Sequence, residues 1–396
     1  MTVDSVKFCQ TEGKMHQPWY VPANYIEGAL INEQGYPFER HDVVTRDGYI
    51  IEMHRIPRGR TPCPEPCQRE PIFLMTALLT ASSSWVLDFP TQSLGYVLAD
   101  NKYDVWLGNL RGNTYGKRHK RYSPRSRRFW NFSFHEHAVY DAPAQIDYIL
   151  NVTKRKSLLY VGLSQGALMF FTMMSEKPEY NDKVKAFAGL APFNKLAHMV
   201  VPPVAFIAPL AEPLLRFADL LGYYEVLPQN SLALPIARIF CSLPRNRALC
   251  SFLGDNFANL GSRYINETRV PLYLCHTPAG TSMKNVIHFD QLVKSKKAQK
   301  FDYGKVINRE YYGQRRPPLY KIANVKTDVG IFWSKGDQFV PPANVKMLLR
   351  ELGSRVKKNH YIDDEYYTHL SFAIALVNPK YLYPDLLEFL ERYRGP

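Results

Sequence analysis

The chain has 396 residues, of which 46% are hydrophobic, enough to bury a large core in one big domain or in one domain with a sizeable insertion. Aromatic residues make up 13% of the chain, which excludes a disordered or low-complexity protein. The formal net charge of +14 favours contact with anionic surfaces such as phospholipid or nucleic acid.

No stretch of the sequence is long and apolar enough to span a membrane. The longest apolar stretch, residues 199–210, contains three prolines. The N-terminal residues include Asp4 and have no apolar core, so we expect no signal peptide there. On this evidence a cytoplasmic location stays open.

Short apolar runs alternate with helix-compatible segments, a pattern that predicts a mostly parallel sheet wrapped by helices. The expected central strands are residues 72–75, 103–107, 158–162, 186–190 and 329–333. Each is followed by a turn or a loop rich in Gly, Pro or Ser. Because ligands gather at the carboxyl ends of the strands in such sheets, we expect the chemistry directly after these runs.

A cluster of basic residues follows the second predicted strand and is called the basic cluster below. Its members are Lys117, Arg118, His119, Lys120, Arg121, Arg125, Arg127 and Arg128. No run of interleaved aromatics and no nucleic-acid motif accompanies them, so a solvated loop is the favoured interpretation and we expect no nucleic-acid partner. Peripheral contact with a lipid surface is the alternative.

Six cysteines are present, and their spacing does not match a zinc site, so we expect no metal and no cofactor. Free thiols are the default interpretation. The alternative concerns Cys241 and Cys250, which flank a short polar loop that a disulfide could close in an oxidising compartment. Three sequons, at Asn131, Asn151 and Asn266, would fit a secreted glycoprotein, although such triplets also arise by chance.

The interval 191–328 holds 138 residues, far more than a crossover between two strands needs. We therefore expect a mainly helical insertion there, between core parts at 1–190 and 329–396, with its last part, about 270–328, returning to the core. The insertion begins with proline-broken apolar pieces at 200–211 and 214–221. These pieces fit a lid over the site and fit the packed helices of a second small core equally well.

The pentad Gly162-Leu163-Ser164-Gln165-Gly166 lies between an apolar strand-like run and a helix-compatible segment. This is the setting in which G-x-S-x-G forms a nucleophile elbow. Glycine fits at positions 162 and 166 because side chains there would clash with the neighbouring strand and helix. The turn exposes the serine hydroxyl, and it aims the Gln165 N–H at a carbonyl oxygen that gains charge.

A serine nucleophile needs a base, and the base needs an acid that orients it. Asp337 directly follows the last predicted strand, 173 residues after Ser164, and His369 lies 32 residues further on, before a helix start. The interval between them accommodates one helix, about 343–352, and one strand, about 360–362.

Rival residues lack this placement. The acids Asp363, Asp364 and Glu365 suggest a solvated turn, and the histidines His276, His288 and His360 suggest surface or hydrogen-bonded structural residues.

Taken together, the motifs are specific, and the chain resembles the acid lipases, the group that contains gastric lipase and lysosomal acid lipase. The similarity covers nearly the whole chain. It is carried by residues 35–37, 47–50, 103–113, 129–134, 140–144, 162–166 and Pro278-Ala-Gly-Thr-Ser282.

The resemblance implies an α/β-hydrolase fold with an inserted cap, and a serine esterase that acts on triacylglycerols or cholesteryl esters at an oil–water interface. It implies the triad Ser164, Asp337 and His369, with the N–H groups of Leu78 and Gln165 as the oxyanion hole. It also implies a disulfide between Cys241 and Cys250 and a secreted or lysosomal location.

One departure from the family's pattern supports a second hypothesis. The family's His-Gly before Leu78 reads here Thr76-Ala77, and alanine resists backbone shapes that glycine adopts. If the Leu78 amide turned away, the barrier would rise by about 2.7–4 kcal/mol. The chain would then be a lipid-binding protein descended from a lipase. A third hypothesis is hydrolysis of another acyl ester, such as a retinyl or wax ester.

Overall fold

The computed structural model describes most of the chain, in four longer ranges and a few residues between them. These are residues 23–61, 68–199, 221–229 and 262–395, with residues 217, 240, 243–246, 249 and 250. The apolar pieces predicted at 200–211 and 214–221 lie outside the described residues, apart from Phe217 and Leu221. The limits predicted for the insertion therefore stay a prediction.

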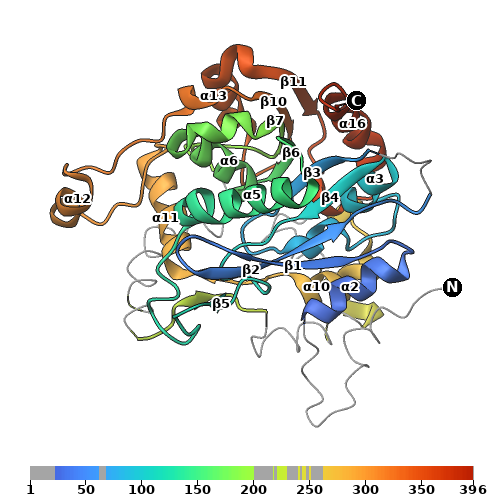
Figure 1. Cartoon of the computed structure of the whole chain (residues 1–396), viewed down its shortest axis with the longest axis horizontal. Coiled ribbons are helices and arrows are strands. Elements are labelled where there is room, and N and C mark those ends of the chain that lie inside the picture. The colour runs from blue at the N-terminus through green and yellow to red at the C-terminus, as the bar shows by residue number, and fades with distance from the viewer. Residues whose placement is uncertain are drawn as a thin grey trace, which may run out of the picture.

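A nine-stranded sheet runs through the centre of the molecule (Figure 1). Its strands are β1 (Glu39–Val44), β2 (Tyr49–Ile56), β3 (Glu70–Met75), β4 (Tyr103–Leu107), β5 (Arg118–His119), β6 (Leu158–Leu163), β7 (Val184–Leu190), β10 (Asp328–Ser334) and β11 (Val356–Ile362). The order is β1-β2-β4-β3-β6-β7-β10-β11, with β5 paired to β2.

The pairs that involve β1, β2 and β5 are antiparallel, and all pairs from β4 to β11 are parallel. A mostly parallel sheet is thereby confirmed, and so are the five predicted central strands, each of which lies within an observed strand. A separate two-stranded sheet joins β8 (Glu225–Val226) to β9 (Thr281–Ser282).

Helices cover both faces of the sheet (Figure 1). The α-helices are α2 (Ala23–Glu33), α3 (Leu94–Asp100), α4 (Phe134–Glu136), α5 (Ala142–Thr153), α6 (Gln165–Glu176), α10 (Val270–His276), α11 (Met283–Ser295), α12 (Lys305–Tyr312), α13 (Pro342–Leu352), α14 (Ser371–Ile374), α15 (Asn378–Tyr381) and α16 (Tyr383–Glu391). One π-helical turn, η2 (His137–Asp141), joins α4 to α5.

Short 3₁₀ turns connect these elements. They are η1 (Ser82–Trp85), η3 (Pro178–Asp182), η4 (Pro244–Asn246), η5 (Ser262–Tyr264), η6 (Glu267–Arg269), η7 (Ile322–Asn324) and η8 (Gly353–Arg355).

Two apolar cores lie on opposite faces of the sheet, because successive side chains of a strand point to opposite sides. In β3, Ile72 and Leu74 belong to the core that α3 and α16 cover. Phe73 and Met75 belong to the core that α5, α6 and α13 cover. Every residue of β3, β4 and β6 is buried, including Glu70 and Asp104, which explains why the other residues of these strands are apolar or aromatic.

The cysteine state differs from the default expectation. Cys250 and Cys275 are both disulfide-bonded, so free thiols were the wrong expectation for these two residues. Local spacing could not reveal this for Cys275, because bridges depend on proximity in the folded chain. Cys241, the predicted partner of Cys250, lies outside the described residues, so that pairing stays a prediction.

In the described ranges, no helix combines the length and the apolar character needed to cross a bilayer.

Candidate active site

Ser164 lies in a tight turn between β6 and α6, at the carboxyl end of a central strand. Its backbone has φ 53° and ψ −111°, a conformation that costs a non-glycine residue on the order of 1–3 kcal/mol. The surroundings hold it there, because the Ser164 N–H donates to the Leu190 carbonyl of β7 at 2.9 Å and the Ser164 carbonyl accepts from the N–H groups of Ala167 and Leu168. Strand and helix together impose the turn.

The two glycines of the pentad allow β6 and α6 to pack against their neighbours. A Cβ atom at Gly162 would lie 2.7 Å from the carbonyl of Gly166. A Cβ atom at Gly166 would lie 2.4 Å from the carbonyl oxygen of Met75 in β3. Both contacts are with backbone, which cannot move aside as a flexible side chain can, so any other residue would shift the elbow.

Ser164, His369 and Asp337 form one hydrogen-bonded line. The Nε2 atom of His369 lies 2.8 Å from the Ser164 Oγ, and its Nδ1 atom lies 2.7 Å from an Asp337 carboxylate oxygen. The other Asp337 oxygen accepts the N–H of Val340 at 2.8 Å. Asp337 follows β10 and His369 precedes α14, so three segments far apart in sequence meet above the sheet.

These contacts determine the tautomer of the imidazole. A carboxylate accepts hydrogen bonds and does not donate them, so the Nδ1 atom of His369 carries the proton. The Nε2 atom is then free to accept the hydroxyl proton of Ser164. Ser164 and His369 are each 7% exposed and Asp337 is 2% exposed, so all three residues are buried.

Two of the three rival acids, Asp363 and Asp364, make their contacts away from His369. One oxygen of Asp364 accepts from the Tyr264 hydroxyl at 2.6 Å and the other from the Tyr366 N–H, whereas Asp363 is exposed and lies 3.8 Å from Lys335. Both acids follow β11 on the loop that leads to His369, but their side chains are engaged elsewhere.

The rival histidines lie away from Ser164. His288 is hydrogen-bonded to the Ser133 hydroxyl and the Gln299 carbonyl, and its burial lowers its pKa to about 3. His360 is bonded to the Tyr381 carbonyl. His276 is buried, 2% exposed, at the end of α10.

The two predicted oxyanion donors follow neighbouring parallel strands. Leu78 lies in the loop directly after β3, and Gln165 is the first residue of α6. The first N–H groups of a helix have no partner within the helix. No acceptor for the Leu78 N–H is found in the described part of the chain. Both amides can therefore receive a hydrogen-bond acceptor from a ligand.

Two threonines brace the loop that carries Leu78. The buried hydroxyls of Thr76 and Thr80 are hydrogen-bonded to one another, and the Thr80 hydroxyl also donates to the Ala77 carbonyl at 3.0 Å. Ala77 has a negative φ, whereas Leu79 takes the left-handed conformation with φ 62°. The backbone strain expected at Ala77 is therefore absent, since alanine adopts negative φ freely. No signal in the sequence pointed to the role of Thr80.

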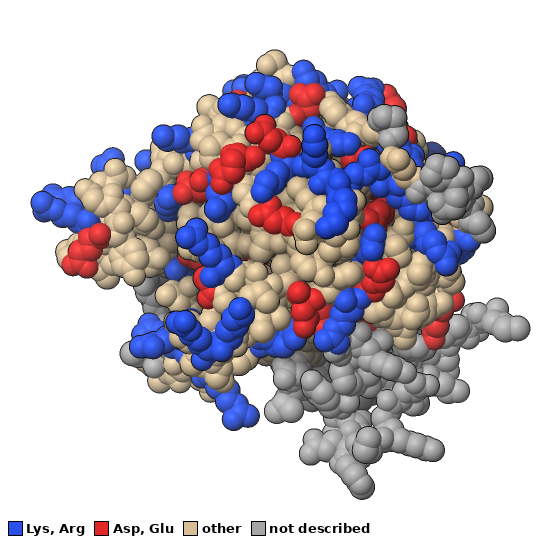
Figure 2. Space-filling model, in the orientation of Figure 1, with Lys and Arg blue, Asp and Glu red and all other residues tan. Residues whose placement is uncertain are grey.

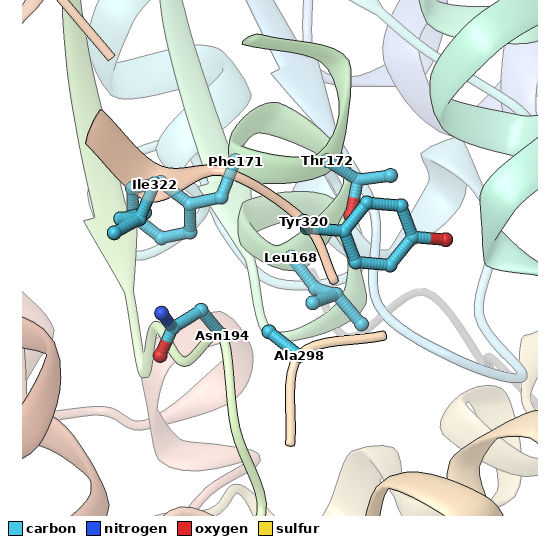
Figure 3. A pocket seen from close by; sticks show the side chains of 7 residues that line it. All are labelled: Leu168, Phe171, Thr172, Asn194, Ala298, Tyr320 and Ile322. Atoms are coloured by element: carbon cyan, nitrogen blue, oxygen red, sulfur yellow. The ribbon is translucent and has the colours of Figure 1, made fainter. Parts of the chain in front are cut away.

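A small cavity lies beside α6, away from the triad (Figure 3). Figure 3 shows Leu168, Phe171 and Thr172 of α6 facing Tyr320 and other side chains across it. Its volume of about 10 Å³ matches roughly one water molecule. It is too small to hold an acyl chain.

Comparison with known proteins agrees with this geometry. A family model described as the partial alpha/beta-hydrolase lipase region matches residues 28–89, and one described as the alpha/beta hydrolase fold matches residues 71–237. Human gastric triacylglycerol lipase is 36% identical over 96% of this chain and 94% of the relative. The chain belongs to the acid lipase family of carboxylic ester hydrolases.

Other relatives of this acid lipase have similar coverage. Human lysosomal acid lipase/cholesteryl ester hydrolase is 35% identical over 92% of the chain and 90% of the relative. The Caenorhabditis elegans lipase lipl-1 is 37% identical over 91% of this chain and 90% of the relative. A solved esterase from Pyrococcus furiosus, 13% identical with a TM-score of 0.51, covers 97% of this chain and 97% of that chain, and shares the fold.

Proposed function

We propose that this acid lipase hydrolyses neutral lipid esters, triacylglycerols or cholesteryl esters, through an acyl-Ser164 intermediate. The observation that carries the proposal is the line from Ser164 Oγ to His369 Nε2 at 2.8 Å and from His369 Nδ1 to Asp337 at 2.7 Å. The names of the relatives, gastric triacylglycerol lipase and cholesteryl ester hydrolase, support the substrate class.

In the first half of the reaction, the Ser164 Oγ bonds to the ester carbonyl carbon while its proton passes to the Nε2 atom of His369. The carbonyl oxygen becomes an oxyanion, which the N–H groups of Leu78 and Gln165 stabilise. The carbon–oxygen bond to the alcohol then breaks. The alcohol, a diacylglycerol or a sterol, takes the proton from His369 as it leaves.

In the second half, water attacks the acyl carbon and gives a proton to His369. The tetrahedral species collapses, the fatty acid leaves, and the proton returns to the Ser164 oxygen. Asp337 keeps its negative charge throughout and stabilises the imidazolium that forms twice in the cycle. Apart from the ester and the water, each of these steps uses only side chains and backbone amides of this chain.

A fluorophosphonate probe tests the proposal directly, because it phosphonylates an activated serine. We expect the probe to label Ser164. We also expect the protein to hydrolyse a p-nitrophenyl ester and a triacylglycerol or a cholesteryl ester, and S164A to abolish this hydrolysis. Lipid that is bound without turnover, and retained equally by S164A, would instead support the lipid-binding alternative. The negative φ of Ala77 and the Thr76–Thr80 bond count against that alternative, because they support a working Leu78 amide.

We also propose that the basic cluster contacts the lipid surface. Arg121, Arg125 and Arg128 are exposed, whereas Lys117 and Arg118 pair with Glu225 and Asp42. Figure 2 shows lysine and arginine side chains over much of one face of the molecule, with acidic side chains between them. Exposed arginines attract anionic headgroups, and this attraction weakens as salt rises.

A further inference from the structure

A short segment on the chain between α10 and α11 touches both halves of the proposed oxyanion hole. It comprises residues 279–285 and is called the bridging segment below. It contains the short strand β9 and the first turn of α11. Its first residues belong to the motif Pro278-Ala-Gly-Thr-Ser282, which supplies no member of the triad.

One end of the bridging segment holds the loop that carries Leu78. The Ala279 N–H donates to the Leu79 carbonyl at 2.7 Å. Leu79 directly follows Leu78 and is the residue of that loop with positive φ. The Leu79 carbonyl belongs to the peptide group between Leu79 and Thr80, two peptide groups after the one that carries the Leu78 N–H. This bond therefore anchors the loop close to that donor.

The other end holds the side chain of Gln165. The Asn285 Nδ2 donates to the Gln165 Oε1 at 2.8 Å and to the Thr281 hydroxyl at 3.1 Å. Its Oδ1 accepts the N–H of Phe134 at 2.7 Å, which fixes the orientation of the amide. Asn285 is fully buried, so water does not compete for these bonds.

A neighbouring histidine holds the second side of the same glutamine. The Nε2 atom of His137 faces the Arg111 carbonyl at 3.3 Å, and its Nδ1 atom lies 3.4 Å from the Gln165 Nε2. Burial, together with the positive charge of Arg111, lowers the pKa of His137 to about 3, so the ring is neutral. Its proton lies on Nε2, because a carbonyl can only accept, and Nδ1 therefore accepts from Gln165.

We propose that the bridging segment sets the spacing between the two oxyanion donors. Asn285 is the positioning residue for the backbone N–H of Gln165, and Ala279 is the positioning residue for the backbone N–H of Leu78. The inference rests on the proposed function. Donors that point at the transition-state oxygen are effective only when they are held in place before the reaction. A segment bonded to both halves supplies that restraint.

Asn285→Leu and Gly280→Ala test the proposal from two points of the segment. The first removes the hydrogen bond to Gln165, together with those to Thr281 and Phe134. The second adds a Cβ atom that would lie 2.8 Å from the Glu225 carboxylate and 3.3 Å from the Gly112 carbonyl oxygen, at a glycine with φ +87°, and so strains the middle of the segment.

Each variant has a matched control near α12. Asn308 is 1% exposed and makes three side-chain hydrogen bonds, as Asn285 does to other groups. Gly304 has φ +92°, and a Cβ atom added there would meet no other atom within 4 Å. We therefore compare Asn285→Leu with Asn308→Leu and Gly280→Ala with Gly304→Ala.

The assay is kcat and KM on a water-soluble p-nitrophenyl ester, expressed per fluorophosphonate-titrated site so that misfolded protein does not count. We expect kcat to fall on the order of 10- to 100-fold in the two test variants, less than when a donor is lost outright. KM should stay unchanged, and the pH dependence of kcat should keep its midpoint because the Ser–His–Asp line is intact. The controls should stay within about twofold of the parent protein.

Gln165→Met offers a second view of the same contact if Asn285→Leu yields too few titratable sites. It should lose as much kcat as Asn285→Leu, and the double variant should lose little more than either one, because both remove one interaction. A kcat equal to that of the controls, a loss confined to KM, or fully additive losses would overturn the proposal. If the parent protein does not react with the probe, or if S164A still hydrolyses the ester, the proposed function fails instead.

Discussion

Replacing Asp337 by asparagine should leave His369 in the tautomer that cannot accept a proton from Ser164. The reason is the N–H of Val340, which donates to one Asp337 oxygen at 2.8 Å. In Asp337→Asn the amide oxygen stays on that N–H, and the amide NH₂ group then faces the Nδ1 atom of His369. The imidazole must accept there, so its proton moves to Nε2, the atom that should receive the Ser164 proton.

The expected loss of kcat follows from the free energy needed to turn the side-chain amide of the Asp337→Asn variant to its opposite orientation. Turning the NH₂ group toward Val340 would restore the productive tautomer but leave a buried backbone N–H without an acceptor. That costs about 1–3 kcal/mol, which at its upper end leaves on the order of 1% of molecules productive. Loss of the negative charge beside the imidazolium adds to this, and complete triad substitutions of this kind reach about 10⁴-fold. We expect kcat to fall by about 10²- to 10⁴-fold.

The assay is p-nitrophenyl ester hydrolysis at neutral pH, with circular dichroism and thermal unfolding to establish that the variant folds. Asp364→Asn is the matched control, because Asp364 is a carboxylate in the same C-terminal part of the chain with its own hydrogen bonds to Tyr264 and Tyr366. It should keep kcat within about threefold of the parent. A folded Asp337→Asn variant that retains more than about a tenth of the activity would refute the assignment of the acid.

Three further predictions concern the elbow, the Leu78 loop and a buried histidine. Gly166→Ala should destabilise the fold by about 1–3 kcal/mol in urea unfolding, because its Cβ would lie 2.4 Å from the Met75 carbonyl oxygen; an unchanged midpoint would contradict this. Thr76→Val keeps the side-chain shape but removes the bond to Thr80, and should lower kcat about tenfold with KM unchanged; full activity would show that the loop needs no brace. Burial lowers the pKa of His54, but the carboxylates of Glu27 and Glu52 outweigh it and raise this pKa to about 9. Because the pKa is raised on folding, this contribution to stability is present below about pH 6.5 and is lost as the pH rises through about 9. Unfolding free energies measured between about pH 6 and 10 should show that decline, and His54→Gln should flatten it.

Much of the fold could be predicted because its signals are local. The strands β3, β4, β6, β7 and β10 are apolar runs of the length that a sheet buried on both faces requires. The G-x-S-x-G pentad predicts the turn at Ser164, since only glycine fits at positions 162 and 166. The disulfide of Cys275 and the hydrogen bond from Asn285 to Gln165 have no local signal in the sequence.

What the sequence by itself determined is the order of elements and the chemistry available at the end of each: a hydroxyl after β6, a carboxylate after β10 and an imidazole before α14. The placement of Asp337 and His369 after predicted elements favoured them over their rivals in the sequence, but only the tertiary structure shows which side chains meet. Asp337 contacts His369 while the closer acid Asp364 turns to Tyr264, because strand register and loop path, and not distance along the chain, set which side chains meet. The same holds for Asn285 and Gln165, which lie 120 residues apart and are joined by one hydrogen bond.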